Sequence, residues 1–260
     1  MKLAQKINAL YYDDEFQPII VYGGANGIGK SSYSIQGLTE ALYWNINHDE
    51  LTEKDYKSWE KVKEFIVFKP VDFIKKCYQL ANEEKREKAI IWDDAGFWLN
   101  SLEWSDPFLI AVGKYLNVAR TNWGSIIFTT PNPLYIIKKI RSMPDRITVK
   151  IEKEGSNYKN PSKPRIALAY LGWLAADLKK TGVNSYWKDD FSAIMPNDFF
   201  RWYKPLRDKY ARMGIKLMIA HLNSLLEKGQ LEEDIDELEA LKRDMFYEDF
   251  TEKEVVELTL

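Results

Sequence analysis

Short, uninterrupted apolar runs recur along the chain up to residue 171, and segments with helical spacing lie between them. The first run, residues 19–22, follows Pro18 and has the pattern of a strand buried on both faces of a parallel sheet. Such a strand needs helices on both sides of its sheet. Similar runs occur at residues 65–68, 89–92 and 125–128, and weaker ones at residues 147–151 and 166–171.

The segments between these runs place apolar side chains three or four positions apart, as amphipathic helices do. Because strands and helices alternate, we predict an α/β fold of three layers around a mostly parallel central sheet. Residues 157–164 contain two prolines and favour a loop between two late strands, as in a hairpin at the sheet edge. The predicted helices lie within residues 1–17, 31–44, 71–84, 107–122 and 134–143.

The pattern changes after residue 194. Pro196, Asn197 and Asp198 resemble a helix start, and large apolar residues then follow at helical spacing as far as Leu225. Nothing in the composition marks a flexible linker at this point. We therefore predict one α/β domain over residues 1–194 and a helical C-terminal extension with an acidic tail over residues 195–260.

The first buried strand leads into a glycine-rich loop that fits the pattern G-x-x-x-x-G-K-[ST] at every fixed position. Glycines allow successive backbone N–H groups to turn toward phosphate oxygens, and the following helix directs the positive end of its dipole at the same charge. In this pattern Lys30 reaches the β- and γ-phosphates, and the Ser31 hydroxyl binds Mg²⁺. The predicted nucleotide-binding residues are Gly24, Ala25, Asn26, Gly27, Ile28, Gly29, Lys30, Ser31 and Ser32.

The buried run at residues 89–92 ends in two carboxylates, Asp93 and Asp94. A nucleotide site of this kind needs an acidic partner for the metal at the end of a neighbouring strand. Asp93 is therefore the predicted Mg²⁺ ligand, directly or through water, and Asp94 is predicted to orient the attacking water. The alternative is that Asp-Asp-Ala-Gly only opens a turn. The phosphate loop earlier in the chain favours the functional interpretation.

With these two motifs, residues 18–153 resemble the P-loop ATPases of the additional-strand class, the broad group that holds AAA+, RecA-like and DNA-pumping motors. In that class a glutamate commonly follows the metal-binding aspartate, whereas this chain has Asp94. A carboxylate that is one methylene shorter reaches about 1.5 Å less far, and a misplacement of that size can slow hydrolysis substantially. The resemblance thus implies an ATPase whose turnover could be slow and dependent on a partner.

The resemblance also implies a polar sensor of the γ-phosphate at the end of the strand that follows the Asp93 strand. Thr129 and Thr130 end the run at residues 125–128, and we predict Thr130 in this role, with Asn132 close by. A threonine pair before a proline is also an ordinary strand end.

Oligomeric ATPases usually insert an arginine into the site of a neighbouring subunit, where it stabilises charge in the transition state. The candidates by position are Arg141, Arg120 and Arg146, in that order of preference. Each of them could instead be a solvated cation at a helix end, where the helix dipole favours positive charge.

The formal net charge of −2 is unevenly distributed along the chain. Residues 227–260 hold thirteen Asp or Glu and four Lys or Arg, so this tail carries −9 and residues 1–226 carry +7. A basic body suits a polyanion such as DNA, although many ordinary enzymes reach this charge. The tail has the spacing of a solvent-facing helix. It could also contact a protein partner or the basic body of another subunit, or occupy the DNA-binding groove until DNA displaces it.

The cysteine content and the length of the apolar runs indicate the cellular compartment in which the protein is expected. Cys77 is the only cysteine, which excludes an intrachain disulfide, and no apolar run approaches the roughly 18 residues that span a bilayer. There is no N-terminal signal pattern. The expectation is therefore a cytoplasmic protein, in a host cell if it belongs to a virus or plasmid, with no membrane contact.

Two short sequence segments support a resemblance to a narrower group of ATPases. Asp-Asp-Ala-Gly-Phe-Trp-Leu at 93–99 and Phe-Thr-Thr-Pro-Asn-Pro at 128–133 are similar to ATPases carried by archaeal viruses and conjugative plasmids. This resemblance implies a small, homo-oligomeric, DNA-associated ATPase that uses ATP and Mg²⁺ in replication, partition or packaging. Two other functions stay open: a nucleotide-dependent switch or scaffold with little hydrolysis, and a small-molecule kinase, which would need a basic lid and an acceptor pocket.

Overall fold

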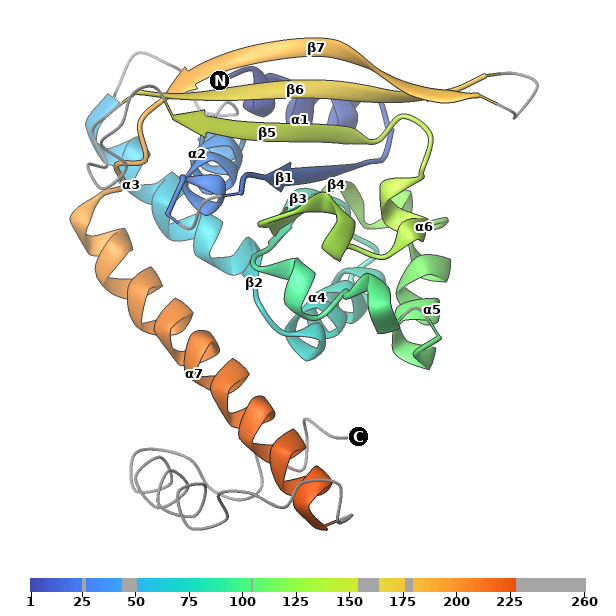
Figure 1. Cartoon of the computed structure of the whole chain (residues 1–260). Helices are drawn as coiled ribbons and strands as arrows, with labels where there is room; N and C mark the ends of the chain where they lie inside the picture. Colours follow the sequence, from blue (N-terminus) through green and yellow to red (C-terminus); the bar gives the residue numbers. More distant parts are fainter. Residues whose placement is uncertain (25–26, 44–50, 104, 154–163, 176–179, 228–260) are drawn as a thin grey trace. The chain divides into compact units, whose positions relative to one another are not determined.

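A mixed sheet of seven strands, in the order β2-β3-β4-β1-β5-β6-β7, organises the part of the chain that the structure describes (Figure 1). The computed structural model describes residues 1–24, 27–43, 51–103, 105–153, 164–175 and 180–227. Strands β1, β2, β3, β4 and β5 all run parallel, and β6 and β7 join antiparallel at one edge. The strands are β1 (Gln17–Tyr22), β2 (Ile66–Val67), β3 (Glu87–Trp92), β4 (Trp123–Thr130), β5 (Ile147–Lys153), β6 (Arg165–Leu174) and β7 (Thr181–Phe191).

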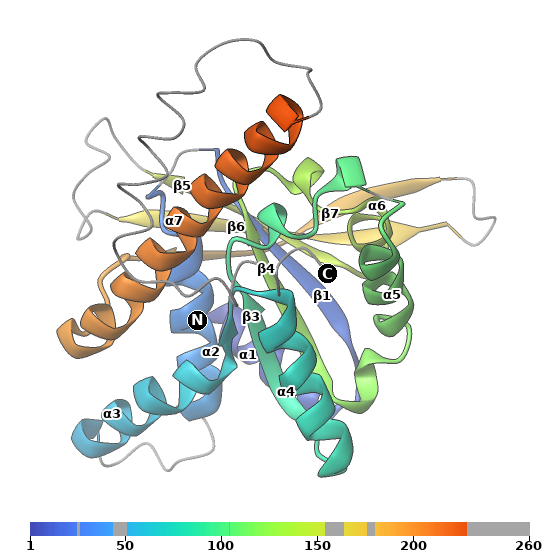
Figure 2. The same ribbon diagram turned by 90° about the horizontal axis from the view of Figure 1, so that it is seen from below.

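Helices cover both faces of this sheet, so the predicted three-layer α/β fold is confirmed. Helices α1 and α2 pack against β3 and β4 on one face, and α4, α5 and α6 lie on the other (Figures 1 and 2). The helices are α1 (Lys2–Tyr12), α2 (Lys30–Tyr43), α3 (Leu51–Val62), α4 (Pro70–Asn82), α5 (Pro107–Tyr115), α6 (Lys138–Arg141) and α7 (Asn197–Glu227), with short 3₁₀ turns between several of them.

Strand β4 lies between β1 and β3, and every one of its residues is buried. The core around it is aromatic: Trp92 and Trp123 are fully buried, and the ring of Phe73 from α4 stacks on Trp92 with 4.7 Å between centroids. Complete burial of a large apolar side chain stabilises a fold by about 1.5–3 kcal/mol. The carboxyl ends of β1, β3 and β4 are thereby held side by side at one edge of the sheet.

The structure differs from the sequence-based prediction in four elements. Helix α3 and strand β7 were not predicted, and the helix predicted over residues 107–122 ends at Tyr115. The residues after Tyr115 include Asn, Val and Thr, which are weak helix formers. The helix predicted over residues 134–143 shortens to the single turn of α6, because Ile136 forms a β-bridge with Asn100 and the Ile137 N–H bonds the Leu99 carbonyl.

Strand β7 escaped prediction because a carboxylate occupies one of its buried positions. Its inward-facing residues are Trp187, Asp189 and Phe191. The Asp189 carboxylate accepts hydrogen bonds from the backbone N–H groups of Lys2 and Leu3 and from the Tyr33 hydroxyl. It therefore caps the start of α1, whose first N–H groups have no partner within the helix, and it ties β7 to α2.

The chain divides into two compact units, Met1–Phe199 and Phe200–Leu260. Within the first unit, Phe199 is buried and packs on the Trp59 ring, with 4.9 Å between centroids. In the second unit, α7 continues through Pro205, and Lys204 pairs with Asp208 one helical turn later. The boundary predicted between residues 194 and 195 lies just before α7 begins, and the acidic tail after residue 227 lies outside the described residues.

Candidate functional site

The glycine-rich loop lies between the end of β1 and the start of α2, as the motif requires. Gly27 and Gly29 have φ angles of +72° and +106°, a region that side chains with a Cβ rarely adopt. Ala25 and Asn26 lie outside the described residues. Helix α2 begins at Lys30, so the free N–H groups of its first turn and the positive end of its dipole are directed at the loop. The described part of the loop thus has the local geometry of a phosphate cradle.

Lys30 is buried, and its side chain reaches back across the loop. Its ammonium group donates a hydrogen bond of 3.3 Å to the Gly23 carbonyl, at the end of β1. Ser32 is also buried within α2. The lysine therefore lies over the loop rather than in solvent, at a position where it can bind a phosphate that enters the cradle.

Asp93, Ser31 and Thr129 meet at the carboxyl edge of the sheet. The Ser31 hydroxyl donates to Asp93 Oδ1 over 2.8 Å, and the Thr129 hydroxyl donates to the same oxygen over 2.5 Å. Asp93 is only 1% exposed and follows β3 directly. Because Trp92 lies opposite Phe128 in the β3–β4 ladder, the next residues, Asp93 and Thr129, are brought together.

These oxygens fit a magnesium ion. Mg²⁺ prefers hard oxygen ligands and is usually held by one or two protein groups together with phosphate oxygens and water. The Ser31 hydroxyl and the Asp93 carboxylate supply such a pair beside the loop. Within the part of the chain that the structure describes, no group of three or more His, Cys, Asp or Glu side chains forms another metal site.

The backbone of Asp94 adopts a left-handed conformation, which aspartate tolerates better than most other residues. Its φ and ψ angles are 50° and 36°, in the left-handed region, and its N–H donates to Thr129 Oγ1 over 2.8 Å. Aspartate and asparagine tolerate this region better than residues with longer side chains. A glutamate, common here in the ATPases that the sequence resembles, would be less favourable in this conformation.

The two threonines at the end of β4 have different partners. Thr129 binds Asp93 and the Asp94 N–H, whereas the Thr130 hydroxyl donates to the Asn132 carbonyl over 2.9 Å and lies against Gly96. Neighbouring residues in a strand point to opposite faces, so only one threonine of the pair can face the aspartates. The sensor role of Thr130 stays a prediction, and the contacts favour Thr129 as the residue that orders the Asp93 carboxylate and the Asp94 backbone.

A pair of isosteric variants separates the two threonines. We expect Thr129→Val to slow ATP hydrolysis by roughly tenfold or more, because an Asp93 oxygen and the Asp94 N–H lose a buried hydrogen-bond partner. Thr130→Val should stay within about threefold of the wild type, as its hydroxyl serves only the Asn132 turn. Hydrolysis rates at saturating MgATP decide between them. A larger loss in Thr130→Val would support the sensor predicted from the sequence.

The three candidate arginines lie in different places. The Arg141 Nε donates to the Ile136 carbonyl over 3.1 Å. Arg120 precedes β4 and pairs with Asp14 over 3.2 Å, and Arg146 precedes β5 and donates to the Met143 carbonyl. Arg120 and Arg146 are therefore at the amino end of the sheet, opposite the phosphate loop of their own chain. Whether any of the three acts in a neighbouring subunit stays a prediction.

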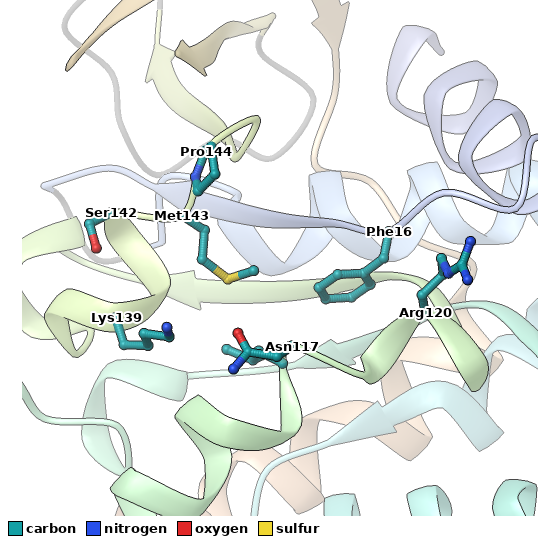
Figure 3. A pocket seen from close by; sticks show the side chains of 8 residues that line it. Phe16, Asn117, Arg120, Lys139, Ser142, Met143 and Pro144 are labelled. Atoms are coloured by element: carbon teal, nitrogen blue, oxygen red, sulfur yellow. The ribbon is translucent and has the colours of Figure 1, made fainter. Parts of the chain in front are cut away.

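A pocket of about 450 Å³ lies at this amino end of the sheet. Figure 3 shows the side chains that line it. Arg120 and Lys139 line it together with the ring of Phe16 and the Met143 side chain. Lys139 also packs its aliphatic stem over Gly113 of α5. The pocket is separate from the phosphate loop, because its residues precede β1, β4 and β5 rather than follow them.

Arg165, the first residue of β6, is part of the loop's surroundings, and no sequence pattern indicated it. Its side chain is 2% exposed, and its Nε donates to the Ile28 carbonyl over 2.8 Å. Burial lowers the pKa of its guanidinium from the ordinary value. The residue follows a stretch that was predicted only as a loop between strands, so its contact with Ile28 depends on the antiparallel pairing of β6 with β5.

The strand order and the site together define the class. A glycine-rich loop between β1 and α2, an aspartate after β3, and a mostly parallel sheet with helices on both faces are the architecture of a P-loop nucleoside triphosphatase fold, in which strand β4 here lies between β1 and β3. The fold class predicted from the sequence is therefore confirmed.

Comparisons with known proteins give distant similarities. No family model matches the chain. Protein B-251 of Sulfolobus spindle-shape virus 1, described as uncharacterised, is 24% identical over 212 residues, which are 80% of each chain. The N-terminal domain of zonular occludens toxin from Neisseria meningitidis is 15% identical, with a TM-score of 0.32, over 71% of this chain and 97% of that one. A KaiC-like protein from Pyrococcus horikoshii is 14% identical, with a TM-score of 0.35, over 65% and 89%.

None of the described helices combines the length and the apolar character that crossing a membrane requires.

Proposed function

We propose that the chain binds ATP with Mg²⁺ and hydrolyses it. The observation that carries this proposal is the 2.8 Å hydrogen bond between the Ser31 hydroxyl and Asp93, which joins the phosphate loop to the acidic end of β3. The bond places the first turn of α2, directly after the glycine-rich loop, on a buried carboxylate at the end of another strand. Two oxygen ligands beside a glycine-rich loop and the N-terminus of a helix suit a metal-bound triphosphate.

Each residue of the site has a distinct task in this proposal. The backbone N–H groups of the loop bind phosphate oxygens, and Lys30 adds a positive charge over the β- and γ-phosphates. Ser31 and Asp93 hold Mg²⁺, which neutralises charge on the phosphates when it is bound. Asp94 orients the attacking water, and Thr129 fixes Asp94 relative to Asp93 through its two hydrogen bonds.

Two other functions of the same site remain to be separated from hydrolysis. A nucleotide-dependent switch or scaffold would bind ATP and scarcely turn it over, which Asp94 in place of glutamate would favour. A small-molecule kinase would use the same loop but pass the phosphoryl group to an acceptor other than water. Single-turnover measurements distinguish the switch, since it would retain intact ATP, and a screen for transfer to nucleosides and nucleotides distinguishes the kinase.

We further propose that the protein works as a homo-oligomer on DNA, in replication, partition or packaging. The +7 charge on residues 1–226 supports a polyanionic partner, and the similarity to a protein of an archaeal virus supports a place among mobile genetic elements. Arg141 is the preferred residue for insertion into a neighbouring site. The acidic tail could bind a protein partner or compete with DNA, and the host cytoplasm is the proposed location.

The dependence of the ATPase rate on protein concentration tests this assembly. If sites are shared between subunits, the rate per chain should rise cooperatively with concentration, because each site is complete only next to a neighbour. The same series with single-stranded and double-stranded DNA added separately should show stimulation by one form. A rate per chain that is constant across the series and indifferent to both DNA forms would leave a monomeric ATPase without a DNA role.

A further inference from the structure

Arg165 contacts the phosphate loop from a strand that no nucleotide-binding motif includes. Its Nε donates to the Ile28 carbonyl over 2.8 Å, and both groups are buried. The contact joins residues far apart in the chain, since Ile28 precedes α2 and Arg165 begins β6. Strand β6 is fixed in turn by its antiparallel ladders with β5 and β7, in which Arg165 lies opposite Lys153 and Phe191.

The arginine also packs on the next residue of the loop. A Cβ placed on Gly29 would lie 2.9 Å from Arg165 Cδ and 3.0 Å from its Nε, so the side chain occupies the space that any larger residue would need. Gly29 has a φ of +106°. The Ile28 carbonyl and the Gly29 Cα flank the same peptide bond, so Arg165 contacts this peptide at two points.

This contact has a consequence for phosphate binding. In a trans peptide the C=O and N–H point in opposite directions, and the described residues contain no cis peptide. If the Ile28 carbonyl is held by Arg165, the Gly29 N–H is directed the other way. A hydrogen bond from a cation to the carbonyl is stronger than a neutral one and polarises the peptide, which makes its N–H a better donor.

Lys153 adds a second positive charge on the same side of the β5–β6 ladder. Cross-strand neighbours project from the same face of a sheet, and Lys153 lies opposite Arg165. Burial lowers the pKa of Lys153, and the charge of Arg165 lowers it further.

We propose that Arg165 is a positioning residue of the phosphate loop, which holds the Ile28–Gly29 peptide so that the Gly29 N–H binds a nucleotide phosphate. The inference rests on the proposed nucleotide binding and adds to it the residue that orients one of the loop donors. Arg165 acts through the peptide and not by contact with the reacting atoms.

Equilibrium titration of MgATP into the full chain and its variants tests this role. Arg165→Met should raise the Kd roughly tenfold or more, because it removes a charge-assisted hydrogen bond that orients a donor. Arg165→Lys keeps the charge but lacks the planar Nε–H fork, and we expect an intermediate increase of about threefold or more. The matched control is Arg86→Met, since Arg86 also bonds backbone carbonyls, those of Leu10, Tyr11, Glu15 and Arg120, but lies before β3 at the other end of the sheet. Its Kd should stay within about twofold of the wild type.

Thermal unfolding of each variant separates this role from a merely structural one. A structural role would lower the Tm of Arg165→Met and of Arg86→Met while leaving both Kd values unchanged below the Tm, and that result would overturn the proposal. If Arg165→Met does not fold, Arg165→Lys decides: a Kd equal to that of the wild type refutes the positioning role. Absence of MgATP binding in the wild type would be a different failure, because it removes the proposed function and with it this inference.

Discussion

Replacement of Lys30 by alanine is expected to abolish measurable ATP turnover. Lys30 is buried, lies over the phosphate loop and is bonded to the Gly23 carbonyl, so its ammonium group is held where a triphosphate would bind. Removal of a preorganised donor from a site of this kind costs roughly 10²- to 10³-fold in rate. The measurement is phosphate release at saturating MgATP, with the Kd for ATP determined in parallel.

The control for this variant is Lys75→Ala. Lys75 is an exposed lysine of α4, and its loss should leave both the rate and the Kd unchanged. Steady-state hydrolysis at the wild-type level in Lys30→Ala would remove the phosphate loop from the mechanism, whatever the fold resembles.

The second large effect is expected in Asp94→Asn. Asparagine adopts the left-handed backbone of residue 94 as readily as aspartate, so the turn after β3 should be preserved. The neutral amide cannot accept a proton from water or orient it as a carboxylate does, and general base groups of this kind contribute roughly 10²- to 10⁴-fold to rate. We therefore expect ATP to bind with nearly unchanged Kd and hydrolysis to fall at least a hundredfold.

The variant Asp93→Asn tests which of the two aspartates binds the metal and which orients the water. Asp93 accepts hydrogen bonds from Ser31 and Thr129 and is the proposed metal ligand, so its neutralisation should weaken binding in the presence of Mg²⁺. If Asp94→Asn instead bound ATP poorly and Asp93→Asn bound it well, the two aspartates would have to exchange roles.

The parts of the site that depend on buried strands could be predicted from the sequence. The runs at residues 19–22, 89–92 and 126–128 are apolar because helices cover both faces of β1, β3 and β4. Carboxyl ends of parallel strands share one edge of a sheet, so a glycine loop after one strand and an aspartate after another meet there. The order of the strands in the sheet was not predicted from the sequence, and the structure places β4 between β1 and β3.

The remaining features depend on pairings between distant segments. Thr129 and Thr130 are adjacent, and only the register of β4 against β3 decides which one faces Asp93. Strand β7 contains a buried aspartate, Asp189, that interrupts the apolar alternation. The groups that donate hydrogen bonds to its carboxylate come from α1 and α2. Arg165 is one of many basic residues in the sequence, and its contact with Ile28 exists only because β6 folds back beside β5. None of these contacts has a local sequence signal.

The most direct measurement is a calorimetric titration of the wild-type chain with a non-hydrolysable ATP analogue, with and without Mg²⁺. The account predicts saturable binding of one nucleotide per chain. The affinity should be higher when Mg²⁺ is present, because Ser31 and Asp93 then bind the ion that the phosphates also bind. No detectable heat at any analogue concentration, together with no change in Tm, would contradict nucleotide binding by this loop.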